Sequence, residues 1–331
     1  MIASEKSGRG AEKHLGRSAF LDEKLTEAME RLMVLGGTPR PALFTRVTSV
    51  HGRRVHYLEA GEGETMLLLH GAGGGAANWY RLFPALAQHY HVIAIDLPGF
   101  GLSESLAPEA PLGIQVARYL DEALVKSVAW GGAQHIIGTS FGGLTAFRLA
   151  QIQPPKSLIL IDAAGLWPEA AWGLRFACNR LIQSIPLKQS RAGTLWLLRN
   201  VLLANRIDPE HEAALADYIY WSNVRTDRRM LARAYTQFAG LRGQSEVFTD
   251  AELRALAHKT LIVWGERDWF LPAREARRSA ALAAGATLRI IPNVGHSPNW
   301  EAPDILLREI LDFVKRDEQE EPARSSRRAD Q

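Results

Sequence analysis

Short apolar runs separated by helical stretches are the feature that most constrains the fold of this chain. The runs are brief and mostly rich in β-branched residues, as strands buried on both faces of a parallel sheet are. They comprise Met66–Leu69, Val92–Ile95, Ile136–Ile137, Leu158–Ile161, Leu261–Trp264 and Leu288–Ile291. Helical spacing of apolar residues fills most of the intervals, including Ala117–Val128, Leu144–Gln151 and Arg274–Ala284. Alternating strands and helices predict an α/β fold with a mostly parallel central sheet flanked by helices.

The segments outside this alternation of strands and helices predict an N-terminal arm and helix, a hairpin and a final helix. Residues 1–18 are polar and charged and predict a disordered arm, whereas Phe20–Met33 has apolar residues at helical spacing. We expect that amphipathic helix to pack on the main domain, with weak contact to a membrane surface or a partner as the alternative. Ala42–Ser49 and Arg54–Glu59 flank a turn and predict a β-hairpin. Pro303–Arg316 predicts a final helix.

One long interval contains helix-like segments rich in Trp, Leu and Arg but no convincing strand. It begins at residue 166, after the sixth strand, and predicts a helical cap inserted into the sheet domain. The expected organisation is an arm and helix over 1–37, a core over 38–165 and 251–316, a cap over 166–250 and a disordered charged tail over 317–331.

Composition is typical of a globular protein with a sizeable core. Of the 331 residues, 47 % are hydrophobic and 23 % charged, and the 39 basic and 36 acidic residues leave a net charge of only +3. No segment combines dense Lys/Arg with aromatics, so no nucleic-acid partner is expected. Cys178 is the only cysteine, which excludes an intrachain disulfide. With no signal peptide and no apolar run of roughly 18 residues, we expect a soluble cytoplasmic protein without a transmembrane segment.

The nucleophile candidate lies where a strand turns into a helix. Strand 134–137 leads into Gly138-Thr139-Ser140-Phe141-Gly142, which matches G-x-S-x-G in the strand–turn–helix context of a nucleophile elbow. Such a turn strains the backbone and brings neighbouring chain close, so glycine at 138 and 142 avoids Cβ clashes. The positive end of the following helix points toward a developing oxyanion. The pattern predicts Ser140 as the nucleophile.

A serine nucleophile needs a base and an orienting carboxylate. His296 lies on the loop between the last strand and the last helix, and Asp268 follows a buried strand directly. Active sites of open parallel sheets lie at the carboxyl ends of the strands, and the order Ser140, Asp268, His296 is the one expected for such a triad. Asp162, at the end of the preceding strand, and Glu266 are the alternatives for the acid.

The glycine-rich stretch after Met66–Leu69 predicts an oxyanion hole. Acyl transfer places negative charge on a carbonyl oxygen, and two backbone N–H groups aimed at it lower the barrier. We assign these donors to Ala72 and Phe141, with Gly71 letting the backbone approach.

The same stretch also fits a dinucleotide-binding unit. Gly71, Gly73 and Ala76 match G-x-G-x-x-A after a strand, and Asp96 ends the next strand. Pro84 and the aromatic residues before it interrupt the helix that this interpretation requires. An oxidoreductase would also leave the triad unexplained, so we expect neither a cofactor nor a metal.

Five motifs in this order resemble the α/β-hydrolase superfamily over nearly the whole chain after the arm. They are HGAGGG at 70–75, DLPGFGLS at 96–103, GTSFGG at 138–143, VWGERD at 263–268 and NVGHS at 293–297. The elbow, DAAGL at 162–166 and the VGHSPNWEAP ending are most similar to monoacylglycerol-lipase-like and carboxylesterase members. This resemblance implies a serine esterase or lipase that forms an acyl-enzyme on Ser140 beneath a helical cap.

Two other functions remain open within the resemblance. The glycine-rich loop and Trp300 are similar to the carbon–carbon bond hydrolases of aromatic degradation, although those usually carry Asn before the nucleophile and Met after it, where this chain has Thr139 and Phe141. Ser140 argues against dehalogenases and most epoxide hydrolases, which have Asp at the elbow. A non-catalytic small-molecule-binding fold is the most distant alternative.

The candidates to line a cap pocket are Trp167, Trp172, Phe176, Trp196 and Trp221.

Overall fold

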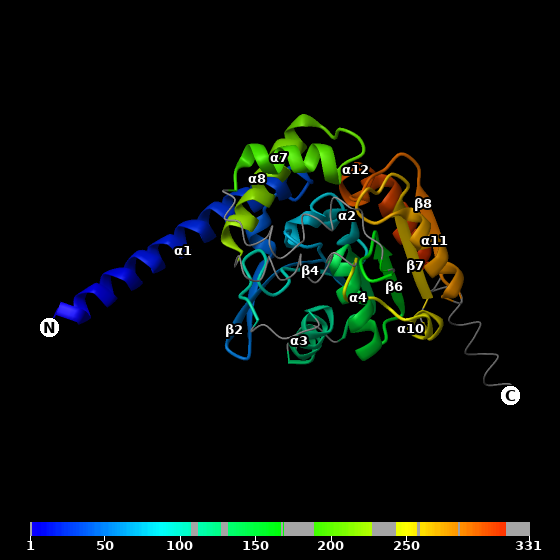
Figure 1. The fold of residues 1–331 in the computed structure, drawn as a ribbon, viewed down its shortest axis with the longest axis horizontal. Coiled ribbons are helices and arrows are strands. Elements are labelled where there is room, and N and C mark those ends of the chain that lie inside the picture. Colours follow the sequence, from blue (N-terminus) through cyan, green and yellow to red (C-terminus); the bar gives the residue numbers. More distant parts are fainter. Residues whose placement is uncertain are drawn as a thin grey trace.

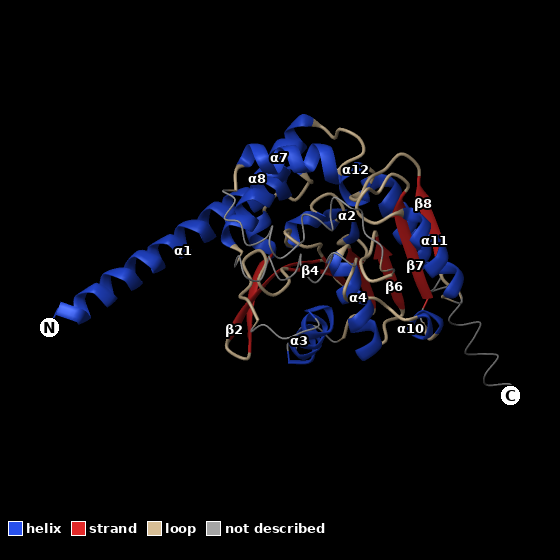
Figure 2. Cartoon of the chain, in the orientation of Figure 1, coloured by secondary structure: helices blue, strands red, loops and turns tan. Residues whose placement is uncertain are grey.

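The sheet forms the centre of the molecule. The computed structural model describes residues 2–106, 112–126, 132–166, 168, 189–226, 243–256, 259–283 and 285–315 (Figures 1 and 2). Its eight strands lie in the order β1-β2-β4-β3-β5-β6-β7-β8, antiparallel from β1 to β4 and parallel from there on. The strands are β1 Thr45–Val50, β2 Arg53–Ala60, β3 Thr65–Leu69, β4 His91–Ile95, β5 His135–Thr139, β6 Ser157–Ile161, β7 Lys259–Gly265 and β8 Thr287–Ile291. The predicted mostly parallel α/β sheet is confirmed.

The helices connect these strands and form the cap. They are α1 Ile2–Leu35, α2 Phe83–Leu86, α3 Leu112–Lys126, α4 Phe141–Ile152, α7 Arg191–Leu197, α8 Pro209–Arg225, α10 Asp250–Arg254, α11 Ala273–Leu282 and α12 Pro298–Glu301. Tighter or wider turns form η1 Pro41–Phe44, η2 Ala76–Trp79 and η3 Leu198–Leu202. A last helical run covers 303–315.

Strands β3 to β7 are buried on both faces of the sheet, which explains why most of their residues are apolar. Successive side chains of a strand point to opposite faces. In β3, Leu67 and Leu69 pack into the cluster that contains residues of α3, α4 and α11. Met66 and Leu68 pack into the opposite cluster with residues of α1, α2 and α8. Because β3 to β8 run parallel, their carboxyl ends lie at the same edge of this packed sheet, where a site can be built.

The carboxyl-terminal half of α1 is part of the second cluster. Leu25, Met29, Leu32 and Met33 recur at helical spacing and are at most 2 % exposed. Arg225 of α8 holds this part of the helix with an ion pair. The opposite end of α1 projects away from the body (Figure 1). The helix begins at Ile2, so the structure differs from the disordered arm expected over residues 1–18.

The interval after β6 contains helices in the part that the structure describes. α7, η3 and α8 follow one another over 191–225, and α8 packs along α1. Asp208 caps α8 by accepting hydrogen bonds from the amides of Glu210 and His211, and Pro209 fits the first turn. The prediction of a helical region inserted after the sixth strand is confirmed.

The first strand starts later than the sequence pattern predicted. Pro41 begins the 3-10 turn η1, and β1 then runs from Thr45 rather than from Ala42. Within this turn the amide of Leu43 donates to the carbonyl of Arg40 at 3.0 Å, so pairing with β2 begins only at Thr45. The expected hairpin itself forms, with antiparallel pairing of β1 and β2 around His51-Gly52.

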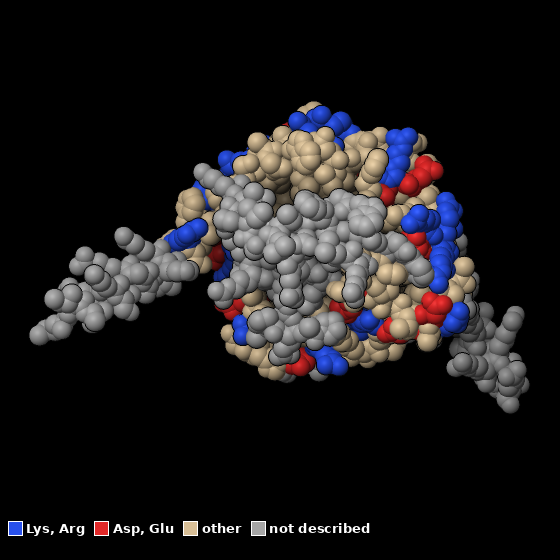
Figure 3. Space-filling view, in the orientation of Figure 1, with Lys and Arg blue, Asp and Glu red and all other residues tan. Residues whose placement is uncertain are grey.

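Acidic and basic side chains are mixed over the visible described surface in Figure 3. Many form pairs, such as Arg289 with Glu309 and Arg148 with Glu246. Within the part of the chain that the structure describes, no helix combines the length and the apolar character that crossing a membrane requires.

Candidate active site

Ser140 occupies a strained turn between β5 and α4. Its backbone has φ 54° and ψ −119°, a conformation that costs energy for a residue with a side chain. A Cβ on Gly142 would lie 2.2 Å from the carbonyl oxygen of Leu69, so the close approach requires glycine there. The amide of Ser140 donates to the carbonyl of Ile161 at 3.0 Å. Bonds to the neighbouring strand therefore fix the position of the elbow.

Ser140, His296 and Asp268 lie within hydrogen-bonding reach of one another in that order. Nε2 of His296 is 3.0 Å from Oγ of Ser140, and Nδ1 is 2.7 Å from Oδ2 of Asp268. Each residue is less than a tenth exposed. Asp268 can only accept through Oδ2, so Nδ1 carries the proton and Nε2 faces the hydroxyl as an acceptor. This arrangement can take a proton from Ser140.

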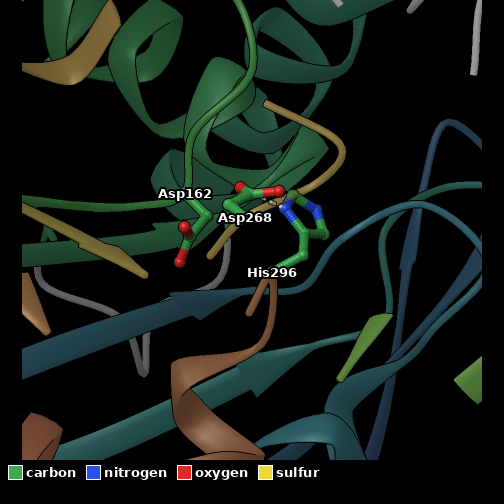
Figure 4. Close-up of side chains that lie close together, drawn as sticks. All are labelled: Asp162, Asp268 and His296. Atoms are coloured by element: carbon green, nitrogen blue, oxygen red, sulfur yellow. Dashed lines mark hydrogen bonds and ion pairs between the residues drawn. The ribbon is translucent and has the colours of Figure 1, made fainter. Parts of the chain in front are cut away.

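Asp268 is itself held by the turn that follows β7. Its Oδ1 accepts the amides of Phe270 and Leu271 at 2.7 and 3.0 Å. Figure 4 shows its carboxylate beside the imidazole of His296. Since the two oxygens have different fixed partners, the carboxylate cannot rotate freely, and the imidazole is oriented as well.

The two alternatives for the acid lie elsewhere. Glu266 is exposed and accepts the amide of Asn293 at 3.0 Å. Asp162 is completely buried at the end of β6 and lies beside Asp268 (Figure 4). No hydrogen bond joins Asp162 to His296, whereas Asp268 makes one. The geometry favours Asp268 as the orienting acid.

Phe270 and Glu301, to which the sequence assigned no role, contact the loop that carries His296. The ring of Phe270 stacks on the imidazole of His296, with centroids 5.0 Å apart. Glu301 accepts the amide of Gly295 at 2.8 Å and the amide of Ala204, from the cap, at 2.8 Å. Burial raises the pKa of Glu301 even though these amides oppose the shift. Phe270 lies two residues after the acid, which is the only sequence signal for it.

The glycine-rich loop lies against the nucleophile. A Cβ on Gly71 would lie 3.1 Å from Cβ of Ser140, so the loop and the elbow are in contact. Ala72 follows on this loop, and Phe141 is the first residue of α4. Among the described groups neither amide has an acceptor. Both N–H groups are therefore free to bind a developing oxyanion, and the roles of Ala72 and Phe141 remain our proposal.

A buried network outside the triad holds this loop. Asp96 accepts the amides of Ala76 and Leu102 at 2.5 and 2.8 Å and pairs with His56 at 2.7 Å. Burial opposes ionisation of Asp96, but His56 and these contacts outweigh it and lower the pKa. Ser222 of the cap donates to Gly74 at 2.9 Å. Asp96, which fitted the dinucleotide-binding pattern, therefore holds the glycine-rich loop in this structure.

The aromatic residues proposed to line a cap pocket are only partly accounted for. Trp196 is 62 % exposed on α7, and Trp221 packs edge-to-face on Phe20 of α1 at 6.1 Å. Neither the exposure of Trp196 nor the contact of Trp221 with Phe20 places these rings at Ser140. Trp167, Trp172 and Phe176 lie outside the described residues. Trp300 is buried and donates through Nε1 to the carbonyl of Asn78 at 3.0 Å.

Comparison with known proteins agrees with this architecture. The model of the alpha/beta hydrolase family matches residues 66–309. The chain is 29 % identical over 281 residues to the 2-hydroxy-6-oxo-6-(2'-aminophenyl)hexa-2,4-dienoic acid hydrolase of Metapseudomonas resinovorans, covering 83 % of this chain and 92 % of the relative. Among solved structures, a putative lipase from Acinetobacter baumannii AYE superposes with a TM-score of 0.71 at 24 % identity, covering 84 % of this chain and 92 % of that one.

A second solved structure points to the same fold. The meta-cleavage product hydrolase from Pseudomonas fluorescens IP01 superposes with a TM-score of 0.69 at 24 % identity, covering 82 % of this chain and 97 % of that one. The match of the family model extends from β3 to the last helical run and includes Ser140, Asp268 and His296. The chain therefore belongs to the alpha/beta hydrolase family.

Proposed function

We propose that this hydrolase attacks a substrate carbonyl with Ser140. The observation that carries the proposal is the continuous chain of contacts from Oγ of Ser140 through the imidazole of His296 to Asp268, at 3.0 and 2.7 Å. An isolated serine hydroxyl is a weak nucleophile, and a neighbouring base that removes its proton activates it. The burial of all three groups strengthens these interactions, because little water competes for them.

The reaction follows from the positions of these groups. Ser140 adds to the carbonyl carbon while Nε2 of His296 accepts the hydroxyl proton, and Asp268 stabilises the imidazolium. The amides of Ala72 and Phe141 bind the oxyanion. His296 returns the proton to the leaving group, which departs and leaves an acyl group on Ser140. Water, deprotonated by the same imidazole, then releases the acid and restores the hydroxyl.

Cleavage of a carbon–carbon bond next to a ketone is the first candidate for the substrate class. Three relatives at 27–29 % identity are hydrolases whose names specify a 6-oxo group on a hydroxylated dienoate or dienedioate. In a vinylogous diketone of this kind, the electron pair of the broken bond delocalises into the conjugated carbonyl system. His296 would then return its proton to that fragment. These relatives support carbon–carbon bond cleavage better than they support ester hydrolysis.

Ester hydrolysis is the second candidate, and the elbow favours it. Thr139 and Phe141 stand where the carbon–carbon bond hydrolases usually have Asn and Met. The identical triad serves both reactions, since each begins with addition of Ser140 to a carbonyl. An alcohol leaving group would take the proton directly from Nε2 of His296.

A hydrolysis panel separates the two candidates. The wild-type chain is assayed with 2-hydroxy-6-oxo-6-phenylhexa-2,4-dienoate and with p-nitrophenyl esters of graded acyl length. We expect kcat/KM for the dienoate to exceed that for the best ester by about 100-fold, or ~2.7 kcal/mol of transition-state stabilisation. Turnover of esters alone would reverse the order of the candidates. Turnover of neither, together with no reaction of Ser140 with a fluorophosphonate, would favour the non-catalytic fold.

A further inference from the structure

Asp162 is a carboxyl beside Asp268 that the proposed reaction does not use. It follows β6, is completely buried and has a positive φ of 41°. Its amide donates to the carbonyl of Val263 at 3.0 Å, and its Oδ1 accepts the amide of Gly265 at 2.9 Å. Its Oδ2 is buried with no hydrogen-bond donor among the described groups. An ionised carboxylate needs more donors than this.

The titratable groups around Asp162 are mostly acidic. One oxygen of Asp162, one oxygen of Asp268 and one ring nitrogen of His296 all lie within 4.8 Å of one another. Glu301 of α12 adds a further negative charge nearby. Of these groups, only His296 can carry a positive charge, and its Nδ1 is already paired with Asp268. No compensating charge is therefore left for Asp162 among the groups that face it.

Two carboxylates so close together in a buried site cannot both be ionised at low cost. Asp268 accepts two amides and the imidazole, whereas Asp162 accepts one amide. The negative charge is better stabilised on Asp268, so the proton belongs on Asp162. Burial, followed by the charge of Asp268, raises the pKa of Asp162 well above its usual range, which agrees with this assignment.

We propose that Asp162 is a positioning residue whose protonated carboxyl donates a hydrogen bond to Asp268 and thereby holds that carboxylate against His296. The inference rests on the proposed function, since it concerns the same triad. A carboxylate has about four acceptor positions, and the known partners of Asp268 fill three of them, so one more donor can be accommodated. The proton stays on Asp162 while His296 gains and loses its own.

The test compares two substitutions of Asp162 with one of Asp268. Asn at 162 tolerates the positive φ, keeps an oxygen for Gly265 and offers an N–H to Asp268, so D162N imitates the protonated acid. D162A removes the donor, and D268N replaces the carboxylate with a neutral amide that favours the wrong tautomer of His296. The readout is the rate of fluorophosphonate labelling of Ser140 from about pH 5 to about pH 9, which spans the usual histidine range and needs no knowledge of the natural substrate.

We expect D162N to label within about threefold of wild type, D162A at least about tenfold more slowly and D268N about 10⁴-fold more slowly. We also expect D162N to reach half its plateau rate at the wild-type pH, since a neutral group replaces a neutral group. If Asp162 were ionised in wild type, D162N would remove a negative charge beside the imidazole and move this midpoint to lower pH. That shift would overturn the inference.

A folded D162A chain that labels at the wild-type rate would also overturn it. If D162A does not fold, by circular dichroism, the midpoint of D162N decides the matter alone. S140A serves as the reference for the proposed function. Retained hydrolysis by S140A refutes the serine mechanism itself, whereas inactive S140A and D268N together with a shifted midpoint in D162N refute only the role given to Asp162.

Discussion

The ring of Phe270 lies nearly parallel to the imidazole of His296, with centroids 5.0 Å apart and planes inclined by 17°. The same turn supplies the amide that holds Oδ1 of Asp268 at 2.7 Å. One short segment after β7 therefore holds the carboxylate of Asp268 through its backbone and covers the imidazole of His296 with its side chain. An aromatic face also stabilises a cation that forms above it.

The stacked ring should accelerate the proton-transfer step. In F270L the imidazolium that forms during attack loses its aromatic contact, so kcat should fall about two- to fivefold, equivalent to ~0.5–1 kcal/mol. Trp269 is the matched control, because it belongs to the same turn but is 74 % exposed. Steady-state kinetics on the best substrate of the panel measures F270L beside W269L. Equal rates for F270L and wild type would show that the stacking is only structural.

The close approach at the elbow should make Gly142 intolerant of a side chain. A Cβ there would lie 2.2 Å from the carbonyl oxygen of Leu69, and backbone cannot yield as a flexible side chain does. We expect G142A to lose about 1–3 kcal/mol of unfolding free energy. A Cβ on Gly16 of α1 would meet no atom within 4 Å, so G16A is the control and should not be destabilised. Urea denaturation measures both; an unchanged midpoint for G142A would contradict the packing described.

The carboxyl-terminal half of α1 should behave as part of the core. Leu32 is fully buried and Val34 is 53 % exposed on the same helix. L32A should therefore cost about 2–5 kcal/mol, while V34A should change stability by less than ~0.5 kcal/mol. Thermal unfolding compares the two variants. Similar small losses in both would mean that α1 is held only loosely against α8.

The buried Asp162 should make stability depend on pH in a defined direction. Its pKa is raised in the folded chain, so the native state retains a proton that the unfolded state releases once pH exceeds the usual aspartate value. The stabilisation that wild type gains from this carboxyl is complete below the usual aspartate pKa. As pH rises from there toward the pKa of the folded chain, it is lost by about 1.4 kcal/mol per pH unit for one proton. D162N has no such proton, so its stability relative to wild type should increase with pH. Urea denaturation at several pH values measures this difference, and a constant difference would show that Asp162 is ionised.

The sequence was sufficient for the parts of the site that depend on local order. Ser140, Asp268 and His296 each follow a recognisable strand, and parallel strands end at one edge, so strand order alone predicts that their ends converge. The short apolar runs likewise predicted the sheet, because side chains buried on both faces are mostly apolar.

Tertiary contacts determined what the sequence could not predict. Glu301 bridges the histidine loop and the cap, a contact between segments nearly 100 residues apart that no local pattern encodes. Asp162 was expected only as a rival acid, since its distance from Asp268 depends on the pairing of β6 with β7. The polar start of α1 has no apolar face, so hydrophobic periodicity predicted disorder where the structure has a helix from Ile2.

The most direct test of the account is the turnover of S140A on the best substrate of the panel, beside the wild-type chain. Because the hydroxyl is the proposed nucleophile, we predict a loss of at least ~10⁴ in kcat with an unchanged circular dichroism spectrum. Full activity in the folded S140A chain would contradict the serine mechanism.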